Sequence, residues 1–226
     1  MASILDCARI STDVYNTRNS DAPGWVRGAV TADLAVGEAF FGATYLRGNE
    51  VVVAFRGSVE AVDWTDADAD IGRGRLPLGQ LADAVGYMNR ASAAAAQRGI
   101  TRLVITGHSL GGGLAQLAVG IRPNSVGVTF NAPGCRNLTG AVHLNLANQD
   151  VWNYRTARDP VSRTGVPLGR PYVSLPVPAT TAERVSRAVG GLPGLLGGYL
   201  AGSGNEHRMA LMLQALGGSS ECGRCV

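Results

Sequence analysis

The feature that most constrains this chain is the pentapeptide Gly107-His108-Ser109-Leu110-Gly111, because the pattern Gly-x-Ser-x-Gly occurs only once in the sequence. An apolar strand is predicted directly before it, over 102–106, and a helix directly after it. In this strand-turn-helix setting the serine sits on a strained turn that exposes its hydroxyl, and the two glycines let strand and helix approach closely. The pattern therefore predicts a nucleophilic serine, the alternative being a glycine-rich turn with an incidental serine.

Strands and helices alternate along most of the chain. Hydrophobic periodicity predicts helices over 3–15, 81–99, 110–120 and 207–216, and strands over 39–46, 51–55, 102–106, 125–130 and 151–156. Residues 16–37 are predicted to be a loop, and the first two strands to form a hairpin. We therefore expect an α/β fold with a central, mostly parallel sheet flanked by helices and an N-terminal β-hairpin. One domain is expected over 1–217, followed by a short C-terminal tail over 218–226.

Charge and cysteine content exclude several classes of protein. The formal net charge is +3 and no run of five basic residues occurs, so nucleic acid is not an expected partner. Four scattered cysteines are too few for a disulfide scaffold. No secretory signal and no stretch of about 20 apolar residues is recognisable. The default expectation is a cytoplasmic protein, with non-classical export as the alternative.

A serine hydroxyl needs a base, and the chain contains three histidines, His108, His143 and His207. His108 is adjacent to Ser109, so its ring is expected to point away from the nucleophile. In folds that carry the nucleophile on such a strand-turn-helix elbow, the catalytic residues follow one another along the chain as serine, then acid, then histidine. His207 satisfies that order near the C-terminus, and His143 precedes the best acid, so His207 is the predicted base. The alternative for His207 is a solvated histidine at a helix start.

The acid that orients the imidazole should follow a strand after the elbow. Asp159 follows the strand predicted over 151–156, and Pro160 fixes the turn. Asp150 precedes the same strand and so lies at its wrong end. Asp159 is therefore the predicted acid, the alternatives being Asp150 or an ordinary Asp-Pro turn at Asp159.

Two backbone N–H groups are needed to stabilise a tetrahedral intermediate. One is expected from Leu110, directly after the nucleophile. The other is expected from Ser58, where the strand over 51–55 ends in a tight turn that Gly57 permits. Ser58 offers both its N–H and its hydroxyl. Arg56 is interpreted as a structural ion-pair partner.

These pieces together resemble the class 3, fungal-type lipases of the α/β-hydrolase superfamily. The matching segments stand in the family order over about residues 39 to 215, and they are Val52–Ser58, Asp63–Trp64, Ile105–Ala115, Thr129–Pro133, Arg158–Val161 and His207. The resemblance implies Ser109, Asp159 and His207 as a triad, with Ser58 and Leu110 as the oxyanion hole. It also implies hydrolysis of lipid-like esters through an acyl-enzyme without a metal or cofactor, and a lid over 59–66. Where the family often has a further proline after Asp-Pro-Val, this chain has Ser162.

Three other features bear on function. The Asp66-Ala-Asp-Ala-Asp70 run fails the spacing of a calcium loop and is interpreted as a solvated edge. Four leucines in a glycine-rich segment are interpreted either as an acyl-chain wall or as ordinary core, and they are Leu192, Leu195, Leu196 and Leu200. Cys222 and Cys225 lack the further ligands of a zinc site, so a loose tail with free thiols or a small disulfide is expected.

The sequence therefore predicts a serine carboxylester hydrolase, similar to a lipase or phospholipase. Its expected partners are a lipid or small ester and the membrane surface that presents it. The alternatives are a non-catalytic lipid- or partner-binding module on the same fold, and an acyltransferase or peptidase that uses the same triad.

Overall fold

The computed structural model describes residues 1–16, 22–35, 38–58, 78–122, 124–138, 150–177, 208–219 and 221–226. Within these ranges, no helix is long and apolar enough to cross a membrane. The helices are α1 (Ile4–Asp13), α3 (Leu78–Ala96), α4 (Leu110–Ile121), the short 3-10 turn η3 (Val161–Arg163) and α7 (Met209–Gly217). The strands are β1 (Val26–Ala35), β2 (Glu38–Arg47), β3 (Glu50–Phe55), β4 (Leu103–His108), β5 (Ser125–Phe130), β6 (Val151–Thr156) and β7 (Val173–Leu175).

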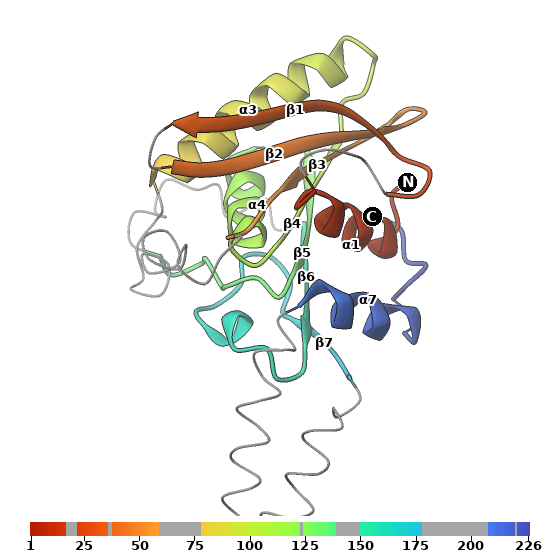
Figure 1. Ribbon diagram of the computed structural model, residues 1–226, viewed down its shortest axis with the longest axis vertical. Coiled ribbons are helices and arrows are strands. Elements are labelled where there is room, and N and C mark those ends of the chain that lie inside the picture. Colours follow the sequence, from red (N-terminus) through yellow and green to blue (C-terminus); the bar gives the residue numbers. More distant parts are fainter. Residues whose placement is uncertain are drawn as a thin grey trace, which may run out of the picture.

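All seven of these strands form one sheet, in the order β1-β2-β3-β4-β5-β6-β7. The first three pair antiparallel, and every pair from β3 to β7 is parallel. The sheet runs down the middle of the molecule, as Figure 1 shows. The predicted mostly parallel sheet and its N-terminal hairpin are therefore confirmed.

The parallel register brings the carboxyl ends of four strands to one edge of the sheet. Phe55 of β3 pairs with Gly107 of β4, His108 pairs with Phe130 of β5, and Phe130 pairs with Tyr154 of β6. The loops that follow these strands leave the sheet together. In open parallel sheets ligands bind at this edge, so the fold places the segments after β3, β4 and β6 where a site is expected.

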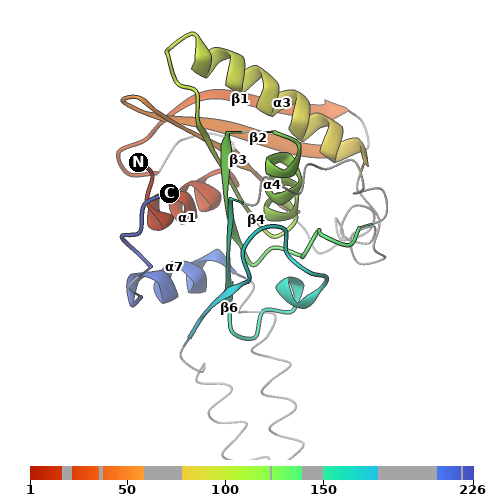
Figure 2. The same cartoon turned by 180° about the vertical axis from the view of Figure 1, so that it is seen from behind.

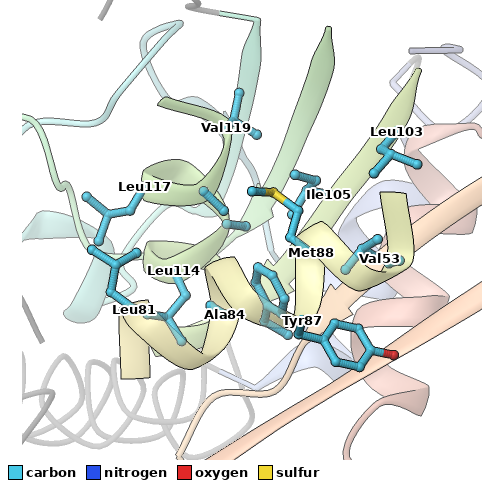
Figure 3. Packing of buried hydrophobic residues seen from close by; sticks show 14 of the residues in the cluster. Val53, Leu81, Ala84, Tyr87, Met88, Leu103, Ile105, Leu114, Leu117 and Val119 are labelled. Carbon is cyan, nitrogen blue, oxygen red and sulfur yellow. The ribbon is translucent and has the colours of Figure 1, made fainter. Parts of the chain in front are cut away.

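Helices cover both faces of the sheet. α3 and α4 lie on one face, and α1 and α7 lie on the other, as the two opposite views show (Figures 1 and 2). Each face has its own apolar core, and Figure 3 shows α3 and α4 packing Leu81, Met88 and Leu114 against the strands. The elbow thus joins β4, a strand of the sheet that lies between the two cores, to α4, a helix of one of them.

The prediction of a loop over 16–37 was wrong over 26–35, because β1 occupies Val26–Ala35. Ala29 interrupts the alternation of apolar and polar residues in this strand, and its register shifts between Arg27 and Ala29, at Gly28. The strand forms because β2 offers it a full-length antiparallel partner. The three-residue β7 carried no periodic signal and was also missed.

The two chain termini meet at the start of α1. A capping box begins the helix, with the Asp6 N–H donating to Ser3 Oγ at 3.1 Å and the Ser3 N–H donating to Asp6 Oδ2 at 2.9 Å. Val226 N–H donates to the Ala2 carbonyl at 3.1 Å, and Ser3 forms a β-bridge with Cys225. The expectation of a loose tail was therefore wrong, because backbone pairing with the N-terminus holds residues 224–226 in place.

Asp6 gives the fold a dependence on pH. Burial alone raises the pKa of Asp6, but hydrogen bonds from Ser3 and the charge of Arg47, 3.1 Å away, outweigh it and hold the pKa below its ordinary value. A carboxyl with a lowered folded-state pKa stabilises the protein above its unfolded value and loses that contribution as the pH falls through the folded value.

We expect Asp6→Ala to lower the free energy of unfolding by about 1 kcal/mol at pH 7, since it removes half of the capping box. The difference from the wild type should shrink below about pH 4, where the carboxyl becomes protonated. Urea unfolding across that range measures it. Asp6→Asn is the control, because it keeps an acceptor for the Ser3 N–H but cannot titrate. A difference that does not change with pH would contradict the assignment.

Candidate active site

Ser109 sits on a strained turn between β4 and α4. Its backbone has φ 56° and ψ −131°, a conformation that costs a non-glycine residue about 1–3 kcal/mol. The Ser109 N–H donates to the Phe130 carbonyl at 3.1 Å, while its own carbonyl accepts from Gly112 at 2.9 Å and from Gly113 at 3.1 Å. These bonds hold the turn at both ends. The predicted strand-turn-helix elbow is therefore observed, with Ser109 only 5 % exposed.

The glycines of the elbow have no room for a side chain. A Cβ on Gly107 would overlap the backbone of Gly111, and a Cβ on Gly111 would overlap the carbonyl of Phe55 at the end of β3. A Cβ on Gly112 would come within 2.6 Å of the Ala132 Cβ. Glycine is therefore required here by backbone-to-backbone contact, as the sequence predicted for Gly107 and Gly111.

The loop after β3 packs directly on the elbow. A Cβ on Gly57 would lie 3.1 Å from the Ser109 Cβ and 2.7 Å from the His108 carbonyl oxygen. Arg56 anchors the loop through Phe41. Its backbone N–H donates to the Phe41 carbonyl at 2.9 Å, and its guanidinium carbon lies 5.0 Å from the centre of the Phe41 ring. The structure thus brings residues 56–58 beside Ser109.

Leu110 begins α4, and it is 3 % exposed. The first-turn N–H groups of a helix have no acceptor within the helix, and the partial positive charge there favours an anion. The two predicted oxyanion donors therefore belong to segments that both adjoin Ser109.

His108 bonds to a residue that the sequence analysis did not single out. Its Nδ1 lies 3.0 Å from the Tyr15 hydroxyl, and the two rings pack with centroids 5.9 Å apart. Tyr15 follows α1, and the Gly57 N–H donates to the same hydroxyl at 3.2 Å. No local pattern identifies Tyr15, because its partners are 93 and 42 residues away in the chain.

Asp159 is fully buried in the turn that follows β6. Its N–H donates to the Thr156 carbonyl at 3.2 Å, and its Oδ2 accepts the Ser162 N–H at 2.6 Å. Asn131, at φ 46°, holds the end of β6, since its Oδ1 accepts the Thr156 N–H at 2.9 Å. Asparagine tolerates this left-handed conformation better than most residues, and this role was missed from the sequence.

Ser162 takes part in this turn through its backbone. A proline at this place would have no N–H and could not donate to Asp159. The side-chain oxygen of Ser162 is buried and has no hydrogen-bond partner among the residues that the structure describes. The backbone amide of Ser162, and not its hydroxyl, therefore contacts the carboxylate.

Asp150, the alternative acid, lies at the opposite end of β6. Its carboxylate pairs with Arg102 at 3.0 Å and with Arg170 at 3.6 Å, all three side chains being substantially exposed. This position beside the amino end of β6 separates Asp150 from the edge at which Ser109 lies and favours Asp159 as the acid.

Several predicted residues lie outside the described residues. They are His207, His143, the segments 59–66 and 66–70, and Leu192, Leu195, Leu196 and Leu200. The helix predicted over 207–216 is observed as α7, which begins at Met209 with Arg208 as its N-cap. Of the predicted site, the structure therefore describes Ser109, the oxyanion candidates Ser58 and Leu110, and the turn of Asp159.

Two of the cysteines are buried too deeply to act as nucleophiles. All four cysteines are free, and Cys7 and Cys135 are completely buried. Burial raises the pKa of Cys135 to about 12 and raises that of Cys7 further, so both thiols stay protonated and unreactive at neutral pH. Within the described parts of the chain, no three His, Cys, Asp or Glu side chains gather as a metal site would require.

A cavity of about 330 Å³ lies between α3 and strands β1 to β3. Leu46, Val51 and Ala91 are among its apolar lining residues, and Arg90 and Arg98 also line it. Its lining includes none of the predicted site residues. We therefore locate the candidate site from the geometry around Ser109 and not from this cavity.

Comparisons of sequence relate the chain to phospholipases. Residues 6–165 match the family model described as "Phospholipase-like: Tle-like phospholipase domain". The chain is also similar to the extracellular phospholipase A1 of Serratia liquefaciens, with 32 % identity over 149 residues, which cover 58 % of this chain and 42 % of that protein. The chain thus spans less than half the length of this relative.

Solved structures of fungal lipases share the fold. The Lip2 lipase of Yarrowia lipolytica superposes with a TM-score of 0.54 at 13 % identity, covering 76 % of both chains. A triacylglycerol lipase of Penicillium expansum gives a TM-score of 0.54 at 18 % identity, covering 78 % of this chain and 79 % of the other. The predicted α/β-hydrolase fold is confirmed.

We expect Gly111→Ala to destabilise the protein by about 1–3 kcal/mol, because its new methyl group must displace the backbone of β3. Gly86→Ala in α3 is the matched control. A Cβ there meets only the end of the Arg90 side chain, at 3.6 Å, so the higher helix propensity of alanine should stabilise that variant by about 0.5–1 kcal/mol. Thermal or urea unfolding measures both. Equal effects of the two substitutions would contradict the close packing of the elbow.

Proposed function

Because the chain belongs to the Tle-like phospholipase family, we propose that it hydrolyses carboxylic ester bonds of phospholipids and related lipids, with Ser109 as the nucleophile. The observation that supports this best is the strained backbone of Ser109, held between β4 and α4 with the loop of Gly57 packed against it. A strain of about 1–3 kcal/mol is retained where the surrounding structure enforces it, and such residues cluster at active sites.

His207 is proposed as the base and Asp159 as the acid that orients it. The chain order Ser109, Asp159, His207 is the order typical of this fold. The complete burial of Asp159 and its hydrogen bond from the Ser162 N–H support a fixed carboxylate. Such a carboxylate holds an imidazole in one tautomer and stabilises the imidazolium that forms during the reaction.

The proposed reaction proceeds through two acyl transfers. His207 removes the proton of the Ser109 hydroxyl as its oxygen attacks the ester carbonyl, and the resulting oxyanion accepts hydrogen bonds from the N–H groups of Ser58 and Leu110. Collapse of this intermediate breaks the ester bond, and the leaving alcohol of the lipid takes the proton from His207. Water then attacks the acyl-enzyme as His207 takes its proton, and collapse of this second intermediate breaks the ester bond to Ser109, releases a fatty acid and returns the proton to the Ser109 oxygen.

The substrate class rests on the family and on the named relative. The Serratia liquefaciens protein is an extracellular phospholipase A1, and we propose a phospholipid presented at a membrane surface as the substrate of this chain. Leu192, Leu195, Leu196 and Leu200 are proposed to line the acyl-chain site, where each buried methylene contributes about 0.8 kcal/mol.

A fluorophosphonate should label the folded protein once, at Ser109, and Ser109→Ala should abolish both the labelling and the hydrolysis of phospholipid vesicles. Ser174→Ala, at an exposed serine of β7 that bonds to Arg155, is the control and should label and hydrolyse normally. Mass spectrometry and fatty-acid release measure the two effects. Absence of labelling on folded protein, with lipid bound but not turned over, would favour a non-catalytic module. Cleavage of peptides would favour a peptidase, and acyl transfer to an alcohol in place of water would favour an acyltransferase.

Ser162→Pro should lower kcat/KM about ten- to hundredfold, since it removes a hydrogen bond to a charged group worth about 1.5–3 kcal/mol. Ser162→Ala keeps the backbone donor and removes a buried hydroxyl that bonds to none of the described residues, so its rate should match the wild type. Steady-state rates on a p-nitrophenyl ester test this, with unfolding curves to verify that both variants fold. Equal rates for folded Ser162→Pro and Ser162→Ala would refute the role given to this amide.

A further inference from the structure

One hydroxyl group connects the two segments that flank the nucleophile. Tyr15 Oη lies 3.0 Å from Nδ1 of His108, and it accepts the N–H of Gly57 at 3.2 Å. His108 directly precedes Ser109, and Gly57 directly precedes Ser58. The Tyr15 hydroxyl therefore bonds to the two residues that directly precede the proposed nucleophile and the proposed oxyanion donor.

The Tyr15 oxygen takes part in two hydrogen bonds, and the direction of one of them is fixed. The amide of Gly57 can only donate, so the Tyr15 oxygen is the acceptor in that bond. The bond to His108 can run either way: Nδ1 accepts the Tyr15 hydroxyl hydrogen when the neutral ring carries its hydrogen on Nε2, and it donates to the Tyr15 oxygen when the hydrogen is on Nδ1. In both cases the Tyr15 oxygen bonds to His108 and to Gly57 at once. Consecutive hydrogen bonds of this kind polarise and strengthen one another, so the Tyr15 hydroxyl joins the loop to the elbow in one continuous chain.

Tyr15 is itself fixed from the side of α1. Ser11, on that helix, bonds through its Oγ to the Thr106 Oγ1 of β4 at 2.9 Å, and the Thr106 hydroxyl donates to the Val128 carbonyl of β5 at 2.7 Å. All three groups are buried. The end of α1 is therefore tied to the strand that leads into the elbow, and Tyr15 extends from a helix with a defined position.

The loop of Gly57 fills the space between Tyr15 and the elbow. A Cβ on Gly57 would lie 2.6 Å from the Tyr15 oxygen and 2.7 Å from the His108 carbonyl oxygen. An oxyanion donor must lie about 2.7–3.1 Å from the developing charge, and a misplacement of about 1 Å can reduce a rate a hundredfold. The position of this loop thus bears directly on the rate.

We propose that Tyr15 is a positioning residue whose hydroxyl holds the loop of Gly57 and Ser58 at the distance from Ser109 that transition-state stabilisation requires. It acts through Gly57 and His108 and does not touch the substrate. The inference rests on the proposed function, because it assigns a role within that reaction.

Tyr15→Phe is the direct test, since it removes only the oxygen and keeps the ring that packs on His108. We expect kcat on a soluble p-nitrophenyl ester to fall about tenfold, less than the hundredfold or more that follows loss of an oxyanion donor itself, with KM within about twofold of the wild type. The matched control is Tyr154→Phe, which removes a hydroxyl bonded to Glu221 at 2.8 Å. Its kcat should stay at the wild-type value, and unfolding curves show whether both variants are folded.

An alkylboronic acid supplies a readout that general loosening would not move in the same way. It forms a tetrahedral adduct with a serine hydroxyl and so resembles the transition state. Because transition-state analogues and catalysis draw on the same interactions, Tyr15→Phe should weaken boronate inhibition by the factor by which it lowers kcat/KM, and Tyr154→Phe should not.

The two proposals can fail separately. If the wild type is labelled at Ser109 and hydrolyses esters, but Tyr15→Phe keeps its kcat and its boronate affinity, the role of Tyr15 is overturned and the proposed function stands. If folded Tyr15→Phe raises KM alone, the hydroxyl contributes to substrate binding and the positioning role is again overturned. If the wild type is neither labelled nor active, the proposed function fails and this inference fails with it.

Discussion

The contact on which the site depends is that of Gly111 with the carbonyl of Phe55. At this point the first turn of α4 reaches the end of β3 with no side chain between the two backbones. Because β3 and β4 are parallel neighbours, this contact brings the loop after β3 to the turn after β4. Backbone packing alone thus brings the proposed nucleophile Ser109 next to the loop that carries the proposed oxyanion donor Ser58.

The strained turn at Ser109 is held by the rest of the fold. Its amide is bonded to Phe130, at the end of the adjacent strand β5, and its carbonyl to the first turn of α4. The two apolar cores, one on each face of the sheet, fix the strand and the helix that meet there. The free energy of burying these cores, at about 25 cal/mol per Å² of apolar surface, is ample against a local cost of about 1–3 kcal/mol.

The sequence predicted those parts of the fold and site that local patterns encode. The pattern around Ser109 defines its own strand, turn and helix, and the β-rich runs on either side of Arg47-Gly-Asn-Glu50 predict the hairpin. β1 follows a turn-rich stretch, contains a glycine and a register shift, and depends on pairing with β2, and it was predicted as loop. The contributions of Tyr15 and Asn131 arise from contacts with residues distant in the chain. Their types and neighbours carry no signal for these roles, which only the folded structure reveals.

The pairing of the chain ends has a topological consequence. Val226 is hydrogen-bonded to Ala2, Arg224 accepts from Ile4, and the amino group of Met1 forms an ion pair with Glu50 of β3. Residues 1–4 and 224–226 thus lie side by side, and the backbone approximates a closed ring. Neither segment can unfold locally without breaking hydrogen bonds to the other. Joining the two ends with a short linker and opening the ring at an exposed turn, such as that at Gly48 between β2 and β3, would preserve every strand pairing described here.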